Sequence, residues 1–370
     1  MRKIKIFQFP IRESKGGVTK YALNNWRYMD KNKFECHFGT CSKSLSFEDE
    51  IINLHAQVRY ISCYAEQNRE QFIKEVKRLF LTEKYDIIHL HTNWWKSFLV
   101  EQIAIECNIS KIIVHSHNTQ IDIKDDITRE KEEKNHNIKK EEFNTSLATD
   151  FWACSNAAAD WLFGSQIPRN KIKIMNNAID VNKFIYNEEV RQKYRKDLGL
   201  ENNFVIGHIG RMVYQKNHEF LLNMFAKVVK NQKNARLLLI GDGELKEDII
   251  NQAQKLNISD KIIMLGYRND AAELLQAMDV FCLPSRFEGF PIVAVEAQSA
   301  GLKCILSNPI TSESKITDNL ELLPFNINSW VDTILNISNG YERKNMHDII
   351  TNVGFNIEKQ IKEVEKLYLY

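Results

Sequence analysis

The sequence predicts an α/β protein with two doubly wound, Rossmann-like domains. Strand-like and helix-like patterns alternate along the chain, which favours parallel strands with crossover helices on both faces of each sheet. The chain has 370 residues, more than one ordinary core needs at about 150 residues per domain. Turn-forming residues at 176–180 separate the two halves. We therefore expect a first domain over 1–178, a second over 179–345 and a closing segment over 346–370.

Composition and charge exclude several classes of protein. A hydrophobic content of 44% and an aromatic content of 10% are typical of a globular protein. Lysine plus arginine (50) nearly balances aspartate plus glutamate (48), and the resulting net charge of +2 argues against a dedicated nucleic-acid binder. No apolar run approaches the roughly 20 residues of a membrane-spanning helix. We expect a cytoplasmic protein, either dissolved or attached peripherally to the inner face of the cell membrane.

The cysteines give no sign of a metal site or a disulfide framework. Their number, seven, is odd, and no two have the close spacing of metal ligands. Reduced thiols in a cytosol fit this pattern better than disulfides. We assign no metal ion.

The first half begins with a predicted strand over 4–9, the glycine pair Gly16-Gly17 and a helical pattern from 18 to about 29. A glycine pair between a strand and a helix lets backbone amides approach a ligand without obstruction by side chains. Taken alone, the pair is an ordinary turn.

The alternation of strands and helices continues to residue 114. Further strands are predicted over 34–39, 58–61, 86–91 and 111–114, and helices near 69–81 and 98–107. In the helix near 69–81, apolar residues fall on one side at helical spacing and basic residues fall elsewhere. We expect this helix to pack on the core, and the alternative is a basic amphipathic surface that touches anionic lipid.

Four histidines lie at the ends of two predicted strands. His89 and His91 end one strand, and His115 and His117 follow the next. Open α/β sheets place their ligands at the carboxyl ends of strands. A structural role is the ordinary interpretation of each histidine, and metal binding is another, although no carboxylate or thiol completes an obvious ligand set.

Residues 122–146 are polar and of mixed charge, with almost no apolar stripe before Phe143. This composition favours a solvated helix or a mobile loop. Because the segment follows the His117 strand, a lid is a further interpretation. Two more strands are predicted over 149–155 and 171–175, on either side of a helix that ends at Gly164.

The second half begins with a helix over about 188–198 and a strand over 204–210. Arg211 and Lys216 lie in the turn between that strand and a helix over 219–229. Two cations in a loop at the carboxyl end of a strand can converge on one diphosphate, because a guanidinium gives directed bonds and an ammonium gives a mobile charge. Ordinary surface solvation is the alternative.

The next predicted strands are 237–240, which leads into a Gly-Asp-Gly-Glu turn, and 261–265, which ends in Gly266-Tyr267-Arg268. A helix over 271–278 follows. A short strand at 305–306 is predicted near the end of this half, and the charged stretch 358–367 has an apolar stripe typical of an exposed closing helix.

The stretch 284–297 carries the strongest functional pattern. It follows an apolar strand over 280–283 and leads into a helix whose first position suits Pro291, because proline has no amide to leave unpaired there. Glu288 lies in the turn, and Glu296 lies about five residues inside the helix, roughly 7 Å along its axis.

Two carboxylates placed in this way could hold two ends of one extended polar ligand. The amides of Gly289 and Phe290, at the start of the helix, favour an anion. The alternative is an ordinary strand-turn-helix in which Glu296 is solvated.

These residues together resemble the retaining glycosyltransferases of family 4, and most of all the branch associated with capsular and exopolysaccharide assembly. The resemblance rests on two glutamates separated by seven residues, within Pro-Ser-Arg-Phe-Glu-Gly-Phe-Pro and followed by Glu-Ala-Gln-Ser-Ala-Gly. Gly-Arg followed by Gln-Lys-Asn at 210–217 and Ala-Cys-Ser at 153–155 match as well. The resemblance implies the GT-B fold, in which two doubly wound domains face each other across a cleft and the last helix packs back on the first domain.

The resemblance also implies roles for the candidate residues. Arg211 and Lys216 neutralise the departing nucleoside diphosphate, Glu288 positions the hydroxyls of the donor sugar, and Glu296 accepts hydrogen bonds from the ribose. His117 orients the sugar or the acceptor.

Further residues are implied as neighbours of the donor. Gly16 and Gly17 lie against the diphosphate and sugar, and Tyr267 and Arg268 lie near the base. Donors aimed at the charge that develops on the diphosphate, including the amides of Gly289 and Phe290, are expected to contribute most to catalysis.

The activity implied is a metal-independent, retaining transfer of a hexosyl or N-acetylhexosaminyl group from a nucleotide sugar, expected to be a UDP-sugar. The expected acceptor is a saccharide, often lipid-linked, and no cofactor is needed. Two alternatives are a nucleotide-sugar epimerase of the same fold and a catalytically silent sugar-binding partner subunit.

Overall fold

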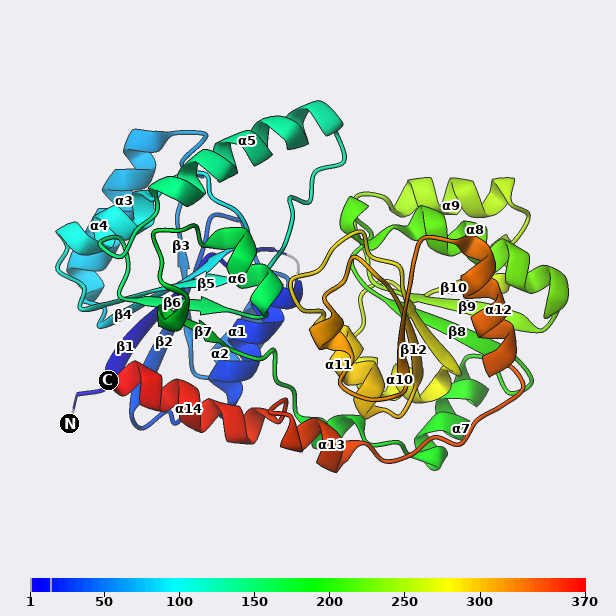
Figure 1. Ribbon diagram of the computed structural model, residues 1–370. Coiled ribbons are helices and arrows are strands. Elements are labelled where there is room, and N and C mark those ends of the chain that lie inside the picture. Colours follow the sequence, from blue (N-terminus) through cyan, green and yellow to red (C-terminus); the bar gives the residue numbers. More distant parts are fainter. Residues whose placement is uncertain (1, 14) are drawn as a thin grey trace. The chain divides into compact units, whose positions relative to one another are not determined.

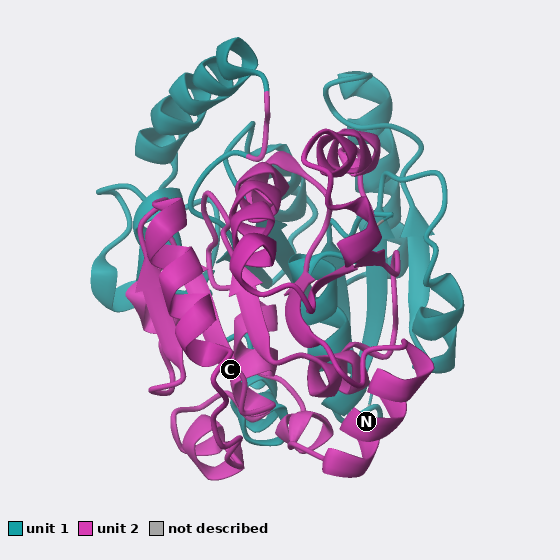
Figure 2. Ribbon diagram, turned by 90° about the vertical axis from the view of Figure 1, so that its right-hand side faces the viewer, with its two compact units in different colours: residues 1–121, 125–177, 357–370 teal, residues 122–124, 178–356 magenta. Residues whose placement is uncertain are grey.

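The computed structural model describes residues 2–13 and 15–370 and divides the chain into two compact units (Figure 1, Figure 2). Unit 1 comprises the residues up to 121, residues 125–177 and residues 357–370. Unit 2 comprises residues 122–124 and 178–356. The chain passes between the units at 121/122, 124/125, 177/178 and 356/357, and a bridge between Ile179 and Asn356 brings the last two of these positions close together.

Unit 1 is built on a seven-stranded parallel sheet in the order β3-β2-β1-β4-β5-β6-β7. Its strands are β1 (Ile4–Phe9), β2 (Phe34–Thr40), β3 (Gln57–Tyr60), β4 (Ile87–Thr92), β5 (Lys111–Ser116), β6 (Asp150–Ala153) and β7 (Ile172–Ile174). The order reverses direction beside β1, which is the topology of a doubly wound sheet.

Helices cover both faces of this sheet. They are α1 (Gly17–Tyr28), α2 (Glu48–Asn53), α3 (Arg69–Glu83), α4 (Leu99–Glu106), α5 (Asp126–Glu142), α6 (Asn156–Leu162) and α14 (Ile357–Leu369), with a 3₁₀ turn at Arg169–Lys171. Successive side chains of β1 explain the arrangement, because they point to opposite faces. Ile6 packs in one cluster with α1 and α14, whereas the ring of Phe7 meets Phe80 of α3 at 5.6 Å.

Unit 2 repeats the plan with a six-stranded parallel sheet in the order β10-β9-β8-β11-β12-β13. Its strands are β8 (Phe204–Ile209), β9 (Ala235–Ile240), β10 (Ile262–Met264), β11 (Val280–Leu283), β12 (Lys303–Ser307) and β13 (Leu320–Leu323). Its helices are α7 (Glu188–Asp197), α8 (His218–Asn231), α9 (Lys246–Lys255), α10 (Ala271–Ala277), α11 (Ile292–Ser299), α12 (Ile327–Ile337) and α13 (His347–Asn352). Short 3₁₀ turns lie at Val181–Phe184, Tyr214–Lys216, Ser259–Lys261 and Ser312–Ser314.

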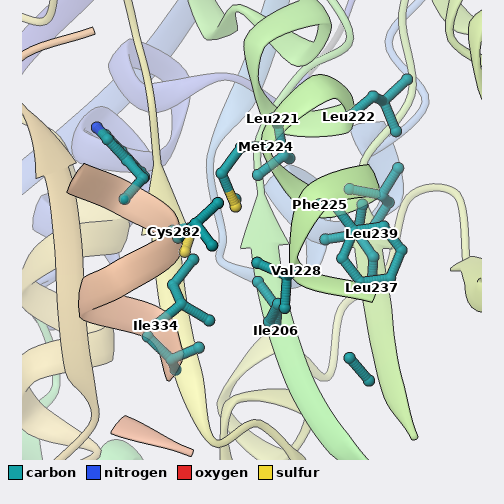
Figure 3. Packing of buried hydrophobic residues seen from close by; sticks show 14 of the residues in the cluster. Ile206, Leu221, Leu222, Met224, Phe225, Val228, Leu237, Leu239, Cys282 and Ile334 are labelled. Atoms are coloured by element: carbon teal, nitrogen blue, oxygen red, sulfur yellow. The ribbon is translucent and has the colours of Figure 1, made fainter. Parts of the chain in front are cut away.

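The core of unit 2 forms between this sheet and α8, α9 and α12. Figure 3 shows Phe225 and Val228 of α8 beside Ile206 of β8 and Leu237 of β9, and all four are fully buried. On the opposite face Gly207 lies so close to Met278, which follows α10, that an added Cβ would come within 1.9 Å of the Met278 sulfur. A core this dense holds the strand ends rigidly, so the loops after them have fixed starting points.

The predicted doubly wound α/β architecture is confirmed in both units. The expected mobile or solvated segment 122–146 contains a helix of 17 residues, α5. None of the helices in residues 2–13 and 15–370 is both long and apolar enough to cross a membrane. The described cysteines form no disulfide.

Candidate active site

The candidate residues of unit 2 lie on loops at one edge of its sheet. Because β10, β9, β8 and β11 are parallel neighbours, the loops at their carboxyl ends share that edge. Backbone hydrogen bonds join the loops in series: the Gly210 amide donates to the Ile240 carbonyl at 2.9 Å, and the Gly241 amide donates to the Gly266 carbonyl at 2.8 Å. Three successive loops therefore form one continuous surface.

Glycine is required where two of these loops touch. Gly241 has φ +137°, and a Cβ there would lie 2.0 Å from the Gly210 carbonyl oxygen. Gly243 has φ +159°, and its Cβ would lie 2.5 Å from the Met212 carbonyl oxygen. Only glycine permits both the conformation and the close approach, so this turn fixes the backbone that carries Arg211.

Lys216 and Glu288 form a close and well-buried charged pair at this edge. The ammonium nitrogen of Lys216 lies 2.5 Å from a carboxylate oxygen of Glu288, and the two side chains are only 12% and 10% exposed. The pair joins the loop after β8 to the loop after β11. Two of the predicted functional groups are thus brought into direct contact.

Gln215 reinforces the same junction. Its side-chain amide donates to the Phe287 carbonyl at 2.9 Å and to Glu288 at 3.3 Å, and its carbonyl accepts from the Arg286 amide at 2.8 Å. The guanidinium of Arg286 also covers the Tyr214 ring at 4.6 Å. Gln215 therefore holds the Glu288 loop in place, and sequence reasoning missed it although it directly precedes Lys216.

Arg211 faces a second carboxylate that the sequence did not suggest. Its guanidinium lies 3.4 Å from Asp122, which also accepts a hydrogen bond of 3.0 Å from the Gln215 amide. Arg211 is 39% exposed at its side chain and Asp122 only 16%. The Asp122 carboxylate thus binds two groups of the loop that is expected to receive a diphosphate, the Arg211 guanidinium and the Gln215 amide. The contact spans 89 residues of sequence, so no local pattern could have revealed it.

Glu296 is buried, which overturns the alternative in which it is solvated. It is the fifth residue of α11 and is 1% exposed. The helix begins at Ile292 with Pro291 as its N-cap, so the expectation that Pro291 takes the first helical position is wrong by one residue. The amides of Gly289 and Phe290 therefore lie in the loop before the helix rather than in its first turn.

Of the remaining predicted residues of unit 2, Tyr267 and Arg268 have exposed side chains, whereas Phe290 does not. Tyr267 is 53% exposed, and Arg268 is engaged by Asp270, with Nε 2.8 Å from Oδ1. Both follow β10, next to the Gly241 loop. Phe290 is buried and stacks on Phe355 at 5.1 Å. Phe290 therefore contributes packing to the loop that carries Glu288.

Gly16 and Gly17 lie in unit 1 at the start of α1. Gly16 is the N-cap, with an ordinary φ of −75°, and a Cβ on Gly17 would meet nothing within 4 Å. The backbone conformation thus does not demand glycine here, but the space beside it is open.

Four of the histidines of unit 1, His89, His91, His115 and His117, form one cluster toward the carboxyl ends of β4 and β5. His91 Nδ1 lies 2.9 Å from His117 Nε2, and His89 Nε2 lies 3.1 Å from His115 Nδ1. Burial lowers the pKa of His91 to about 3, and burial with the neighbouring imidazoles lowers the pKa of the other three well below the ordinary value. All four rings are therefore neutral at physiological pH.

The cluster also has the dimensions of a possible ligand set. Nitrogens of His89, His91 and His115 lie within 4.8 Å of one another. Both nitrogens of His89 and His91 and the Nδ1 of His115, however, already have hydrogen-bond partners in Gln8, Tyr368 and the other histidines. The structure thus favours a hydrogen-bonded network at these rings.

The helix α5, within the segment proposed as a lid, is anchored to unit 1 by a buried histidine. His136 accepts a hydrogen bond of 3.0 Å from the Trp95 amide and lies 3.1 Å from the Trp161 carbonyl. Its ring also stacks on Trp161 at 4.1 Å. These contacts fix the middle of α5 to the rest of unit 1.

Comparison with known proteins assigns each half of the chain to a family model. Residues 15–183 match the model described as "Glycosyltransferase Family 4", and residues 190–353 match "Glycosyl transferases group 1". The chain is 27% identical to EpsF of Bacillus subtilis, which carries the name of a glycosyltransferase, over 96% of this chain and 94% of the relative.

A second relative and a solved structure extend the comparison. The chain is 28% identical to the Escherichia coli UDP-Gal:alpha-D-GlcNAc-diphosphoundecaprenol alpha-1,3-galactosyltransferase, over 99% of this chain and 97% of the relative. Its fold is similar to that of Anabaena HepE, crystallised with UDP and glucose, with a TM-score of 0.80 and 17% identity over 98% of this chain and 99% of that chain.

Proposed function

The chain is a glycosyltransferase of the GT-B fold, and we propose that it is a retaining, metal-independent enzyme of surface polysaccharide assembly. Its donor is a UDP-sugar carrying a hexosyl or N-acetylhexosaminyl group, and its acceptor is a lipid-linked saccharide. The observation that carries the proposal is the junction of Lys216, Gln215 and Glu288 beside Arg211.

The chemistry explains why this junction suits a sugar transfer. Cleavage of the anomeric bond leaves positive charge on the sugar and negative charge on the departing diphosphate. Arg211 and Lys216 supply two cations on one loop, so the protein itself offers charge stabilisation at the diphosphate.

Glu288 has a second role in this proposal. Its carboxylate is held by Lys216 and Gln215, which fixes its direction. A carboxylate held in this way accepts hydrogen bonds from sugar hydroxyls and keeps the anomeric carbon against the diphosphate. Glu296 receives the ribose hydroxyls, and the diphosphate oxygen takes the proton of the acceptor as the new bond forms on the same face.

The residues of unit 1 complete the assignment. His117 orients the sugar or the acceptor with a neutral ring nitrogen, and Gly16 and Gly17, with open space beside Gly17, admit the donor. Tyr267 and Arg268 flank the base. The name of the Escherichia coli relative supports the choice of a UDP-sugar as the donor and of a lipid-linked acceptor. The UDP and glucose in the HepE crystal also support a uridine nucleotide.

A donor panel tests the proposal. Purified protein is incubated with UDP-hexoses and UDP-N-acetylhexosamines, with and without a diphosphoundecaprenol-linked saccharide and in the presence of a chelator, and UDP release is measured. We expect UDP release that depends on the acceptor, persists with the chelator and yields an α-linked product from an α-linked donor.

Each alternative predicts a different result in the same panel. Conversion of the nucleotide sugar without an acceptor would establish the epimerase. Binding without turnover would establish the silent partner subunit. Release that stops with the chelator, or a product of inverted configuration, would contradict metal independence or retention.

A further inference from the structure

Gln8 at the end of β1 joins two branches of the histidine cluster in unit 1. Its side-chain oxygen lies 2.7 Å from His91 Nε2, and its side-chain nitrogen donates to the Tyr368 hydroxyl at 3.4 Å. Gln8 is 2% exposed, so water does not compete for either contact. The two ends of one amide thus face two different branches of the network.

The first branch determines where His117 carries its proton. An amide oxygen only accepts hydrogen bonds, so His91 must donate from Nε2. A neutral imidazole has one N–H, so His91 Nδ1 is bare and accepts from His117 Nε2. His117 is also neutral, and its Nδ1 is therefore bare.

The second branch agrees with this direction. The Tyr368 hydroxyl accepts from Gln8 and still has its own proton to donate to His89 Nδ1, 2.7 Å away. His89 then donates from Nε2 to His115 Nδ1. In the first branch every step follows from the orientation of the Gln8 amide, and the reversed amide would reverse those steps.

The bare nitrogen of His117 is available to a ligand. His117 is only partly buried, and its Nδ1 has no hydrogen-bond partner within residues 2–13 and 15–370. His117 follows β5 directly, at the sheet edge where α/β proteins bind ligands. A bare ring nitrogen there accepts a hydrogen bond from a hydroxyl group.

We propose that Gln8 is a positioning residue that acts through His91 to hold His117 in the tautomer with its proton on Nε2, so that Nδ1 accepts a hydrogen bond from a saccharide hydroxyl. The inference rests on the proposed function for the identity of the ligand. The tautomer itself is a property of the free protein. The predicted tautomer and the proposed function can therefore be refuted separately.

Nitrogen NMR of the histidine-labelled protein measures the tautomer directly. Long-range proton–nitrogen correlations on the free wild-type chain are expected to show His117 and His91 with the proton on Nε2. A proton on Nδ1 of His117 would show the reversed amide and overturn the inference, whatever the enzyme transfers. A change of these signals on adding a chelator would show a bound metal in place of the network and would also overturn it.

Variants then test the role of Gln8. In Gln8→Met the apolar side chain keeps the volume and removes the acceptor, so His117 is expected to populate both tautomers. His91→Phe should give the same mixture, and the double variant should change the mixture no further, because both residues act on one path. A single, unchanged His117 tautomer in Gln8→Met would overturn the role of Gln8.

Activity provides the last readout. In both single variants kcat/KM is expected to fall about two- to tenfold, the value of one neutral hydrogen bond, while UDP affinity stays constant. Circular dichroism and melting identify a variant that does not fold, and in that case the wild-type spectrum still decides the tautomer. A wild type with the expected tautomer but no transfer activity would refute the proposed function alone.

Discussion

The two units present opposite chemistry at the carboxyl ends of their central strands. In unit 1, the ends of β4 and β5 carry four neutral imidazoles that bond to one another and to Gln8 and Tyr368. In unit 2, the ends of β8 and β11 carry charged groups that form the pair Lys216–Glu288 and the pair Arg211–Asp122. The same architecture thus supports a neutral network in one unit and a charged one in the other.

This difference indicates a division of labour. A neutral network fixes the directions of hydrogen bonds and adds no charge, which suits a group that orients a sugar or an acceptor. A charged network stabilises the negative charge that grows on a departing diphosphate. The predictions below separate the two networks, from the largest expected effect to the smallest.

The stability of unit 1 should depend on acid more strongly than that of unit 2. Burial lowers the pKa of six histidines in unit 1 and of two in unit 2: His37, His89, His91, His115, His117 and His136, against His208 and His218. Above pH about 6.5, folded and unfolded chains both hold them neutral, so the contribution to stability is complete there. Below pH about 6.5, these histidines bind protons in the unfolded chain but stay neutral in the folded chain. The free energy of unfolding therefore falls by up to about 1.4 kcal/mol per histidine for each pH unit.

Hydrogen exchange at pH 7.5 and 5.5 measures this difference. Amides of β4 and β5 should lose more protection on acidification than amides of β8 and β9. Equal losses in the two sheets would contradict the contrast between the networks.

Removal of one cation from unit 2 should nearly abolish transfer. Lys216→Ala is expected to lower kcat about 10²- to 10³-fold, as for the loss of one preorganised donor, and Arg211→Ala and Glu288→Ala should have effects of similar size. Lys246→Ala is the matched control, because Lys246 lies 3.3 Å from Asp242 on the same sheet edge and is 43% exposed. Steady-state UDP release with an acceptor measures all four.

Two other results for these variants would contradict the proposed role of Lys216. Full activity in Lys216→Ala would remove Lys216 from the mechanism. An equal loss in Lys246→Ala would show that general positive charge, rather than the loop after β8, is what matters.

The sequence revealed the charged network more fully than the neutral one. Arg211, Lys216 and Glu288 were identifiable because the residues around them resemble the motifs of a known family; their charge alone is also compatible with ordinary surface solvation. The strands and most helices were identifiable from their periodicity. By contrast β13, α2 and α13 were missed because they are short, and α9 because it is polar. The helix α12 was missed although its buried Trp330, Val331 and Ile334 form an apolar stripe.

The partners of these residues could not be predicted. The contact of Gln8 with His91 spans 83 residues, and that of Asp122 with Gln215 spans 93. Each depends on the order of strands in the sheet or on the path of a loop, and neither leaves a local pattern in the sequence. Histidines at strand ends were visible, but the tautomers that define their use follow only from the three-dimensional network.

Two glycines from the two units should respond differently to alanine. Gly241→Ala places a Cβ 2.0 Å from the Gly210 carbonyl oxygen at φ +137°, so unit 2 should lose stability by about 1–3 kcal/mol. Gly17→Ala meets open space at the start of α1 and should leave the stability of unit 1 unchanged or slightly raised. Hydrogen exchange of each sheet measures both. A stable Gly241→Ala variant would show that the loop tolerates a different backbone.

The smallest expected effect concerns Asp122. Its carboxylate occupies the Arg211 guanidinium and the Gln215 amide, where we expect the diphosphate. Asp122→Ala should tighten UDP binding by no more than about fivefold, because Arg211 is partly exposed and solvent screens the pair. Asp248→Ala is the control. Asp248 pairs at 3.2 Å with Lys124, which lies two residues after Asp122, and among the described ion pairs it has none with Arg211. Weaker UDP binding in Asp122→Ala, measured by calorimetry, would instead make Asp122 a support for the loop.

A crystal structure of the protein with an intact UDP-sugar tests the central claim most directly. The account predicts diphosphate oxygens within hydrogen-bonding distance of the Arg211 guanidinium and the Lys216 ammonium, with sugar hydroxyls on the Glu288 carboxylate. A nucleotide bound away from the loop after β8, with these three side chains in contact only with water, would contradict it.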